Sequence, residues 1–174
     1  MESPFYRDLN KALRNNNFSG FNQYIFTLYN GLNRKIIKDF HDGYLYRSSC
    51  ITINELNGIV NSFCRLVLAR TFLSFSKEKK VVMCFLQPNK LNPNLKNILF
   101  VVNPLKQKNI TVTNMDIEEI SEYKDEKEVL FLPFSGFEIS NINEGNEYIT
   151  IYLNYLNKYE KKSWIILMRE VKIE

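Results

Sequence analysis

Hydrophobic residues near the start of the chain recur at helical spacing. Phe5, Leu9 and Leu13 are each four positions apart, and Pro4 suits the first turn of a helix. A longer stretch over residues 19–40 has apolar side chains along one side of a second helix. The chain is therefore expected to begin with two amphipathic helices.

Farther along, the pattern changes from helical spacing to a mixture of short elements. Residues 44–47 form an aromatic run that predicts a short strand. Residues 52–63 predict a third helix, because Thr52 followed three positions later by Glu55 is the pattern of a capping box. A strand and a helix are thus expected before the longest strand-like region begins.

In the rest of the chain, short apolar runs alternate with polar turns, which is typical of strands. The expected strands cover residues 66–76, 81–86, 98–102, 110–112, 129–132, 137–139, 148–153 and 164–168. The run at 81–86 fits a short helix equally well. Residues 88–94 contain two prolines and three asparagines and are expected to form a loop. Helices first and strands afterwards predict an α+β fold rather than an alternating parallel sheet.

The composition fits a folded protein. Hydrophobic residues make up 45% and charged residues 24%, which argues against disorder, and 174 residues predict one domain over residues 1–174. No window reaches the roughly 18 apolar residues of a membrane helix, and residues 1–15 lack the apolar stretch of a signal peptide. We expect a cytoplasmic protein with no membrane partner, or an effector exported by a specialised machine.

The charge is mildly basic, with a net value of +4 and a pI near 8.9. Lysines and arginines are scattered, and the densest run, residues 77–80, is interrupted by an acid and is expected to be a solvated turn. A nucleic-acid partner is therefore not expected. The positive charge would still favour a small anion such as a dinucleotide through long-range attraction.

The sequence argues against several kinds of catalytic or metal site. The six glycines form neither Gly-x-Gly-x-x-Gly nor a P-loop, and His41 is the sole histidine. Cys50, Cys64 and Cys84 lack the Cys-x-x-Cys spacing of zinc and redox sites, so these thiols are expected in the core. We expect no bound metal, which leaves the chemistry of carboxylates and arginine.

Polar residues that suit this chemistry stand in a distinctive order. They are Arg47 at the end of an aromatic run, Ser74 and Ser76 in an apolar run, and Glu126 and Glu128 before another apolar run. On a strand, residues two positions apart face the same way. The two serines therefore share a face, and the two acids point into one cleft if their strand extends back to the first.

This order resembles the arginine–serine–glutamate class of mono-ADP-ribosyltransferases, of the arginine-specific type. Residues 9–14, 117–122 and 133–139 look like the family's flanking sequence, so the resemblance extends over most of the chain. It implies N-terminal helices followed by a mainly antiparallel two-sheet core. It also implies NAD as a substrate without a metal, release of nicotinamide, and a protein with an acceptor arginine as the partner.

The resemblance further implies a role for each residue. Glu128 would be the catalytic acid, which bonds the 2′-hydroxyl of the nicotinamide ribose and stabilises the positive charge that develops there. Glu126 would orient the guanidinium of the acceptor, and Arg47 would hold the pyrophosphate of NAD. Ser74 would position the catalytic glutamate and support the ribose, with Ser76 as a second hydrogen-bonding group at the NAD site.

Two positions depart from the family pattern. Ser48 stands where glycine often follows the arginine, and Phe75 stands where threonine often lies between the serines. We expect Phe75 to point to the opposite face from Ser74. Two alternatives to the transferase remain open: an NAD glycohydrolase, in which water replaces the acceptor, and a catalytically silent domain that binds a nucleotide or a protein.

Overall fold

The computed structural model describes residues 4–15, 17, 20–36, 41–61, 65–86, 94–104, 114–133 and 135–156. The helices in these ranges are α1 (Pro4–Arg14), α2 (Asn22–Ile36), α3 (Ile53–Val60), α4 (Lys79–Met83) and the 3-10 helix η1 (Lys124–Glu126). The strands are β1 (Leu45–Thr52), β2 (Leu66–Ala69), β3 (Leu73–Ser76), β4 (Leu95–Val102), β5 (Asn114–Asp116), β6 (Glu128–Phe131), β7 (Ser135–Glu144) and β8 (Ile149–Tyr155). In the part of the chain so described, none of the helices has the length and apolar character needed to cross a membrane.

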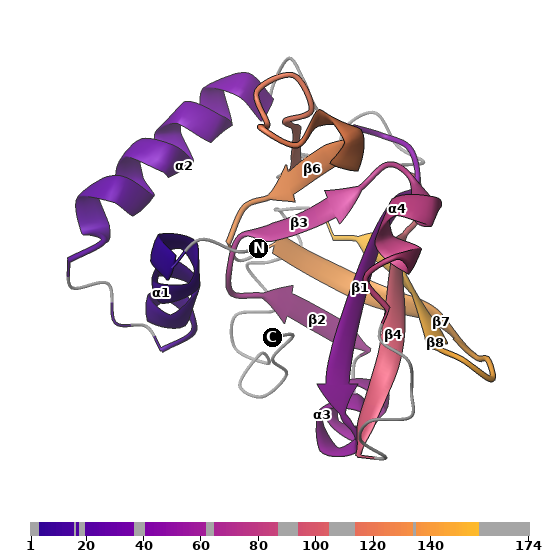
Figure 1. Ribbon diagram of the computed structural model, residues 1–174. Helices are drawn as coiled ribbons and strands as arrows, with labels where there is room; N and C mark the ends of the chain where they lie inside the picture. Colours follow the sequence, from indigo (N-terminus) through magenta and orange to yellow (C-terminus); the bar gives the residue numbers. More distant parts are fainter. Residues whose placement is uncertain are drawn as a thin grey trace.

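Hydrogen bonds join the strands into one curled sheet with the order β2-β7-β8-β4-β1-β3-β6-β5 (Figure 1). All neighbours are antiparallel except β4 and β8. A single residue pair, Tyr46 opposite Ser76, joins β1 to β3. This link divides the sheet into a five-stranded part (β2, β7, β8, β4, β1) and a three-stranded part (β3, β6, β5), which confirms the predicted α+β fold with a mainly antiparallel core.

The main hydrophobic core lies between the two parts of the sheet. Phe75 on β3 and Phe131 on β6 have ring centroids 5.1 Å apart, and Phe131 lies 5.2 Å from Phe137 on β7. Tyr155 on β8 is 5.9 Å from Phe137 at a steep angle, an arrangement that aromatic pairs favour. Aromatic packing therefore fixes the three-stranded part against the five-stranded part.

Helices cover the outer faces of both parts. Leu9 and Leu13 of α1 are buried in a cluster with Met115 of β5, and Figure 1 shows α1 and α2 on the side of the three-stranded part. On the five-stranded part, Val82 of α4 packs against Leu99 of β4. The short helix α4 is thereby held close to β1, at the edge where the two parts meet.

The predicted helices form, with shorter bounds than expected. The helix predicted over residues 52–63 is α3, and its capping box is present: the Thr52 hydroxyl accepts from the Glu55 N–H, and the Glu55 carboxylate accepts from the Thr52 N–H. The helix predicted over residues 19–40 is α2 (Asn22–Ile36), and residues 37–40 lie outside the described residues. The apolar spacing and the capping pattern were therefore sufficient to predict these elements.

The structure corrects two of the predicted strands. The run at 66–76 is divided into β2 and β3, because the chain turns at the polar residues Arg70 and Thr71. At 81–86 the alternative of a short helix holds and the strand does not: residues 81–83 belong to α4, which begins at Lys79, and residues 84–86 follow the helix. Strand β5 was not predicted, because its three residues include only one apolar side chain.

Three of the predicted elements fall on parts that the structure does not describe. The strands expected at 110–112 and 164–168 lie outside the described residues, as does the loop at 88–94 apart from its last residue. The division of the chain into one domain over residues 1–174 stays a prediction.

Candidate active site

A pocket of about 210 Å³ opens at the junction between the two parts of the sheet. Its walls come from β1, β3, β6, η1 and the region of α4. Every site residue selected from the sequence lines this one pocket: Arg47, Ser74, Ser76, Glu126 and Glu128. The fold thus brings together three motifs that are far apart in the chain, while the roles assigned to these residues stay predictions.

The pocket lies where β1, β3 and β6 are side by side. Ser76 is opposite Tyr46 on β1 and opposite Glu128 on β6, so these three residues form a row across the strands. Next to this row, the Nη1 atom of Arg47 donates a hydrogen bond of 2.8 Å to the carbonyl oxygen of Ser74. The half-buried guanidinium is therefore attached to the backbone of the strand that carries the serines.

Strand β3 contributes to both the core and the pocket. Phe75 is buried in the core between the two parts of the sheet, which confirms that its side chain points away from the serines. Ser76 is buried as well, and its hydroxyl accepts a hydrogen bond of 3.0 Å from the backbone N–H of Glu78. The phenylalanine between the serines therefore belongs to the core and also forms part of the pocket lining.

The two glutamates reach the pocket from different backbone conformations. Glu128 is the first residue of β6, whereas Glu126 is the last residue of the 3-10 helix η1. Between them, Lys127 has φ +45° and ψ +54°, a left-handed conformation that is uncommon outside glycine. The strand therefore does not extend back to Glu126, because the N–H groups of Glu126 and Lys127 close a turn on the carbonyls of Tyr123 and Lys124.

Two lysines form ion pairs close to this turn. Lys77 donates to Asp116 at 2.6 Å and to Glu118 at 2.5 Å. Burial lowers the pKa of Lys77, but the hydrogen bonds to these two carboxylates outweigh it, so the pKa is raised overall. The second lysine, Lys127, pairs with Glu78 at 2.7 Å.

The ion pair between Lys127 and Glu78 changes the pKa of both of its members. The hydrogen bond from Lys127 lowers the pKa of Glu78, and the same bond raises the pKa of Lys127. Both groups are therefore held in their charged forms at neutral pH. The run at 77–80 was expected to be a solvated turn, but two of its members, Lys77 and Glu78, form specific long-range contacts.

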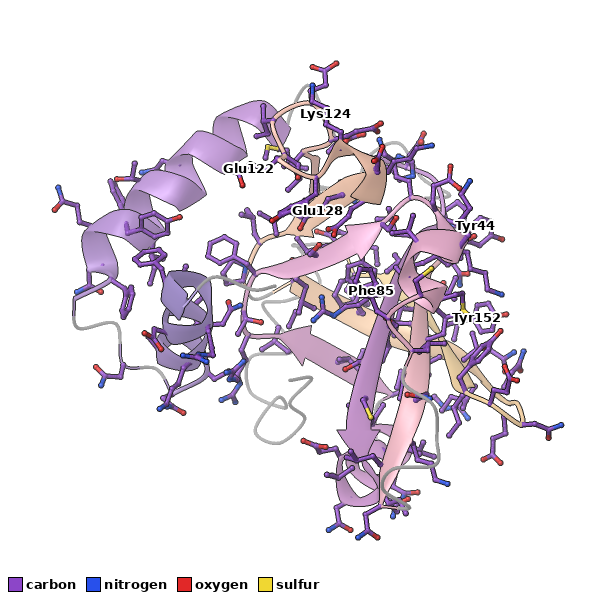
Figure 2. The ribbon with its side chains drawn as sticks, viewed as in Figure 1. Tyr44, Phe85, Glu122, Lys124, Glu128 and Tyr152 are labelled. Atoms are coloured by element: carbon purple, nitrogen blue, oxygen red, sulfur yellow. The ribbon has the colours of Figure 1, made fainter. Side chains whose placement is uncertain are left out.

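Phe85, which the sequence analysis did not select, also lines the pocket. Its side chain is 61% exposed, a large value for a phenylalanine. Figure 2 shows Phe85 beside α4 and Glu128 on β6, two of the elements that form the pocket walls. The only sign of this role in the sequence is its position within the apolar run at 81–86.

The thiols do not behave as predicted. Cys50 and Cys84 are exposed rather than buried in the core, because Cys50 is on an outward-facing position of β1 and Cys84 ends helix α4. Cys64 lies outside the described residues. Across the described ranges, no group of three histidine, cysteine, aspartate or glutamate side chains is arranged to hold a metal ion.

Comparisons by sequence gave no match: no protein-family model and no curated protein matches the chain. Solved structures do match. Vis, an ADP-ribosyltransferase toxin from Vibrio splendidus, is 26% identical with a TM-score of 0.69 in an inhibitor complex, over 90% of this chain and 69% of Vis. A complex of Vis with agmatine matches at 25% identity and a TM-score of 0.67, over 90% of this chain and 70% of Vis.

Two further structures share the architecture at lower identity. The ADP-ribosyltransferase HopU1 of Pseudomonas syringae pv. Tomato is 20% identical, with a TM-score of 0.68 over 90% of this chain and 67% of HopU1. Exoenzyme S from Pseudomonas aeruginosa, bound to carba-NAD, is 17% identical, with a TM-score of 0.59 over 87% of this chain and 68% of the other. The resemblance to mono-ADP-ribosyltransferases is therefore confirmed, and the likeness to Vis supports ADP-ribosyl transfer as the general reaction.

Proposed function

We propose that this chain is an NAD-dependent mono-ADP-ribosyltransferase that transfers ADP-ribose to an arginine of a protein and releases nicotinamide. The observation that carries the proposal is that one pocket is lined by Arg47, by Ser74 and Ser76 of β3 and by the two glutamates, in a chain with the fold of Vis. NAD as substrate is supported by exoenzyme S, which was solved with carba-NAD. Arginine as acceptor is supported by the complex of Vis with agmatine, because agmatine carries the same guanidinium group as arginine.

In this reaction, the bond between C1′ of the ribose and the nicotinamide nitrogen breaks, and its electron pair leaves with nicotinamide. A guanidinium nitrogen of the acceptor then forms a bond to C1′ and gives up one proton. Positive charge builds up on C1′ and the ring oxygen before the new bond is complete. A fixed carboxylate next to this charge interacts with the transition state more strongly than with the substrate, which is the requirement for catalysis.

Glu128 is the acid that we assign to the ribose. Its backbone is fixed on both sides, because it pairs with Ser76 on β3 and its carbonyl oxygen accepts a hydrogen bond from Ile117 at 3.0 Å. Glu126 is assigned to the acceptor, where a carboxylate orients a guanidinium and takes up the proton that it loses. Glu126 suits this part because it lies on the turn at the rim of the three-stranded part.

Arg47 and the serines are assigned to NAD itself. The hydrogen bond from Arg47 to the Ser74 carbonyl fixes the plane of the guanidinium in the pocket wall, and such a fork suits the oxygens of a pyrophosphate. The hydroxyls of Ser74 and Ser76 are assigned to the support of the ribose and of the catalytic glutamate. Ser76 is nearly buried, so its hydroxyl is held in place by the surrounding backbone.

The partner and the place of action follow from this reaction as part of the proposal. The partner is a protein with an exposed arginine that can enter the pocket beside Glu126. The place of action is the cytoplasm, either of the cell that makes the protein or of a cell that receives it as an exported effector. The second option is supported by Vis, which is a toxin.

An assay with two labels on NAD tests the reaction. One label is on nicotinamide and one on adenine, and the acceptors are agmatine and a protein lysate. We expect nicotinamide release together with label on both acceptors. Nicotinamide release with free ADP-ribose and unlabelled acceptors would instead identify an NAD glycohydrolase. The absence of nicotinamide release with and without acceptor would identify a catalytically silent domain.

A further inference from the structure

Lys127, between the two glutamates of the pocket, makes contacts to which the proposed reaction assigns no role. Its N–H donates to the carbonyl of Lys124 at 3.1 Å, and its own carbonyl accepts from the N–H of Lys77 at 3.0 Å. Its ammonium group donates to Glu78 at 2.7 Å. The turn that carries the glutamates is thus attached to the segment after β3 by a backbone hydrogen bond and an ion pair.

Glu78, the partner of Lys127, is itself attached to the serine strand. Its N–H donates to the hydroxyl of Ser76 at 3.0 Å, and that hydroxyl lies 3.3 Å from the carbonyl of Glu78, to which it donates. A continuous series of contacts therefore runs from Ser76 through Glu78 to Lys127. This series joins the serine motif to the acid motif through side chains, in addition to the pairing of β3 with β6.

The two glutamates depend on this series to different degrees. Glu128 belongs to strand β6 and is held by the backbone pairing with β3. Glu126 lies before the left-handed residue, outside the strand, so the direction of its side chain follows from the conformation of Lys127. A change at Lys127 should therefore displace Glu126 while leaving Glu128 in place.

We propose that Lys127 is a positioning residue that orients Glu126 toward the acceptor through its ion pair with Glu78. This inference rests on the proposed function, in which Glu126 serves the acceptor and Glu128 serves the ribose. In the described part of the chain, the ammonium of Lys127 forms its ion pair with Glu78 and forms none with Glu126 or Glu128. Because both partners are partly exposed, at 41% and 34%, the pair is expected to affect geometry more than stability.

The test compares the transfer of ADP-ribose to agmatine with the hydrolysis of NAD in water. For Lys127→Met and for Glu78→Gln, we expect the kcat of transfer to fall about fivefold, while hydrolysis and the KM for NAD change less than about twofold. Lys127→Arg should retain transfer. The exchange of charges, Lys127→Glu with Glu78→Lys, should recover part of the loss, because the ion pair forms again in the opposite sense.

Two further variants separate the ion pair from other effects. Lys127→Gly removes the ammonium but adopts the left-handed conformation without strain, so it should lose transfer as Lys127→Met does. Lys80→Met is the matched control, since Lys80 lies 4.0 Å from the same carboxylate with a side chain that is 83% exposed. This control should keep both activities at the wild-type level.

The outcomes distinguish failure of this inference from failure of the proposed function. If the wild type neither releases nicotinamide nor labels agmatine, the proposed function is wrong, and the inference falls with it. If the wild type is active but Lys127→Met and Lys127→Gly keep its ratio of transfer to hydrolysis, only the inference is wrong. Equal losses of both activities, with a lower melting temperature, would assign Lys127 a structural role and would also overturn the inference.

Discussion

The five-stranded and three-stranded parts of the sheet are held together by different means. Strands β1 and β4 pair at eight positions and β7 and β8 at seven, whereas β3 and β6 pair at four and β5 and β6 at three. The three-stranded part adds ion pairs of Lys77 and Lys127 to these short pairings. Yet this part, with η1, supplies Ser74, Ser76 and both glutamates of the pocket.

This difference suggests that stability and activity depend on different kinds of contact in the molecule. Long pairings and the aromatic core provide the scaffold, while short strands and side-chain contacts set the geometry of the pocket. Substitutions in the two regions should therefore change different measured quantities. Four predictions test this division, beginning with the largest expected effect.

Glu128→Gln should remove catalysis while leaving the fold intact. The amide keeps the shape of the side chain but loses the negative charge that stabilises the developing cation. We expect nicotinamide release to fall by about a thousandfold or more, with a melting temperature close to that of the wild type. Glu138→Gln is the matched control, because Glu138 is an exposed glutamate on β7 and should retain full activity. A Glu128→Gln protein with substantial activity would contradict the assignment.

Phe137→Ala should do the opposite, by weakening the scaffold. Phe137 is fully buried on β7, where its ring contacts Phe131 and Tyr155. We expect a loss of about 3–5 kcal/mol in the free energy of unfolding, measured by urea denaturation. Phe26→Ala is the control, since Phe26 is 68% exposed on α2 and its removal should change stability little. Equal losses for both variants would mean that the core is not where the stability lies.

Glu126→Gln should reduce transfer to the acceptor while leaving the hydrolysis of NAD. We expect transfer to agmatine to fall by about a hundredfold, because an amide neither holds a guanidinium by a charge-assisted pair nor accepts its proton. Hydrolysis of NAD should remain, since Glu128 still serves the ribose. Both rates are measured with doubly labelled NAD. Parallel losses of transfer and hydrolysis would show that the two glutamates do not divide the work.

Lys77→Met should reduce stability moderately, with a characteristic dependence on pH. The variant lacks the two ion pairs that Lys77 forms, and we expect the free energy of unfolding to fall by about 1 kcal/mol near neutral pH. Burial lowers the pKa of Lys77, but the hydrogen bonds to the two carboxylates raise it by more. The pKa in the folded state is therefore above its usual 10.5. The ion pairs of Lys77 therefore stabilise the fold fully when the pH is below the ordinary pKa of lysine. This stabilisation is lost as the pH rises through the raised pKa of the folded state.

The pH dependence is checked by denaturing the wild type and the Lys77→Met variant at a series of pH values. The difference between the two proteins should be constant from about pH 7 to pH 10 and should shrink above that range. Lys79→Met serves as a control, since Lys79 is exposed on α4 and forms no ion pair in the described part of the chain. A difference that grows with rising pH would contradict the raised pKa.

Much of the fold could be predicted because its signals are local. The spacing of Leu9 and Leu13 and the capping box of Thr52 with Glu55 each lie within a few residues and depend on helical geometry alone. The alternation of serines with Phe75 likewise predicted which side chains leave the core. For these elements the local signal was sufficient, and the prediction was confirmed.

The contacts that shape the pocket could not be predicted from spacing. Lys77 meets Asp116 across 39 positions of the chain, and Lys127 meets Glu78 across 49. Nothing in one sequence indicates which distant charges pair, because exposed charges occur throughout the chain. The left-handed turn at Lys127 was hidden for another reason: the residue is not glycine, so no local preference indicated it.

The single residue pair between β1 and β3 has a mechanical consequence. It is the shortest bridge between neighbouring strands in the described sheet, so the sheet resists shear least along this seam. Arg47 stands on one side of the seam and Glu128 on the other. A dinucleotide bound by both residues would connect the two parts of the sheet across this seam. Its binding would add resistance to unfolding where the backbone supplies least.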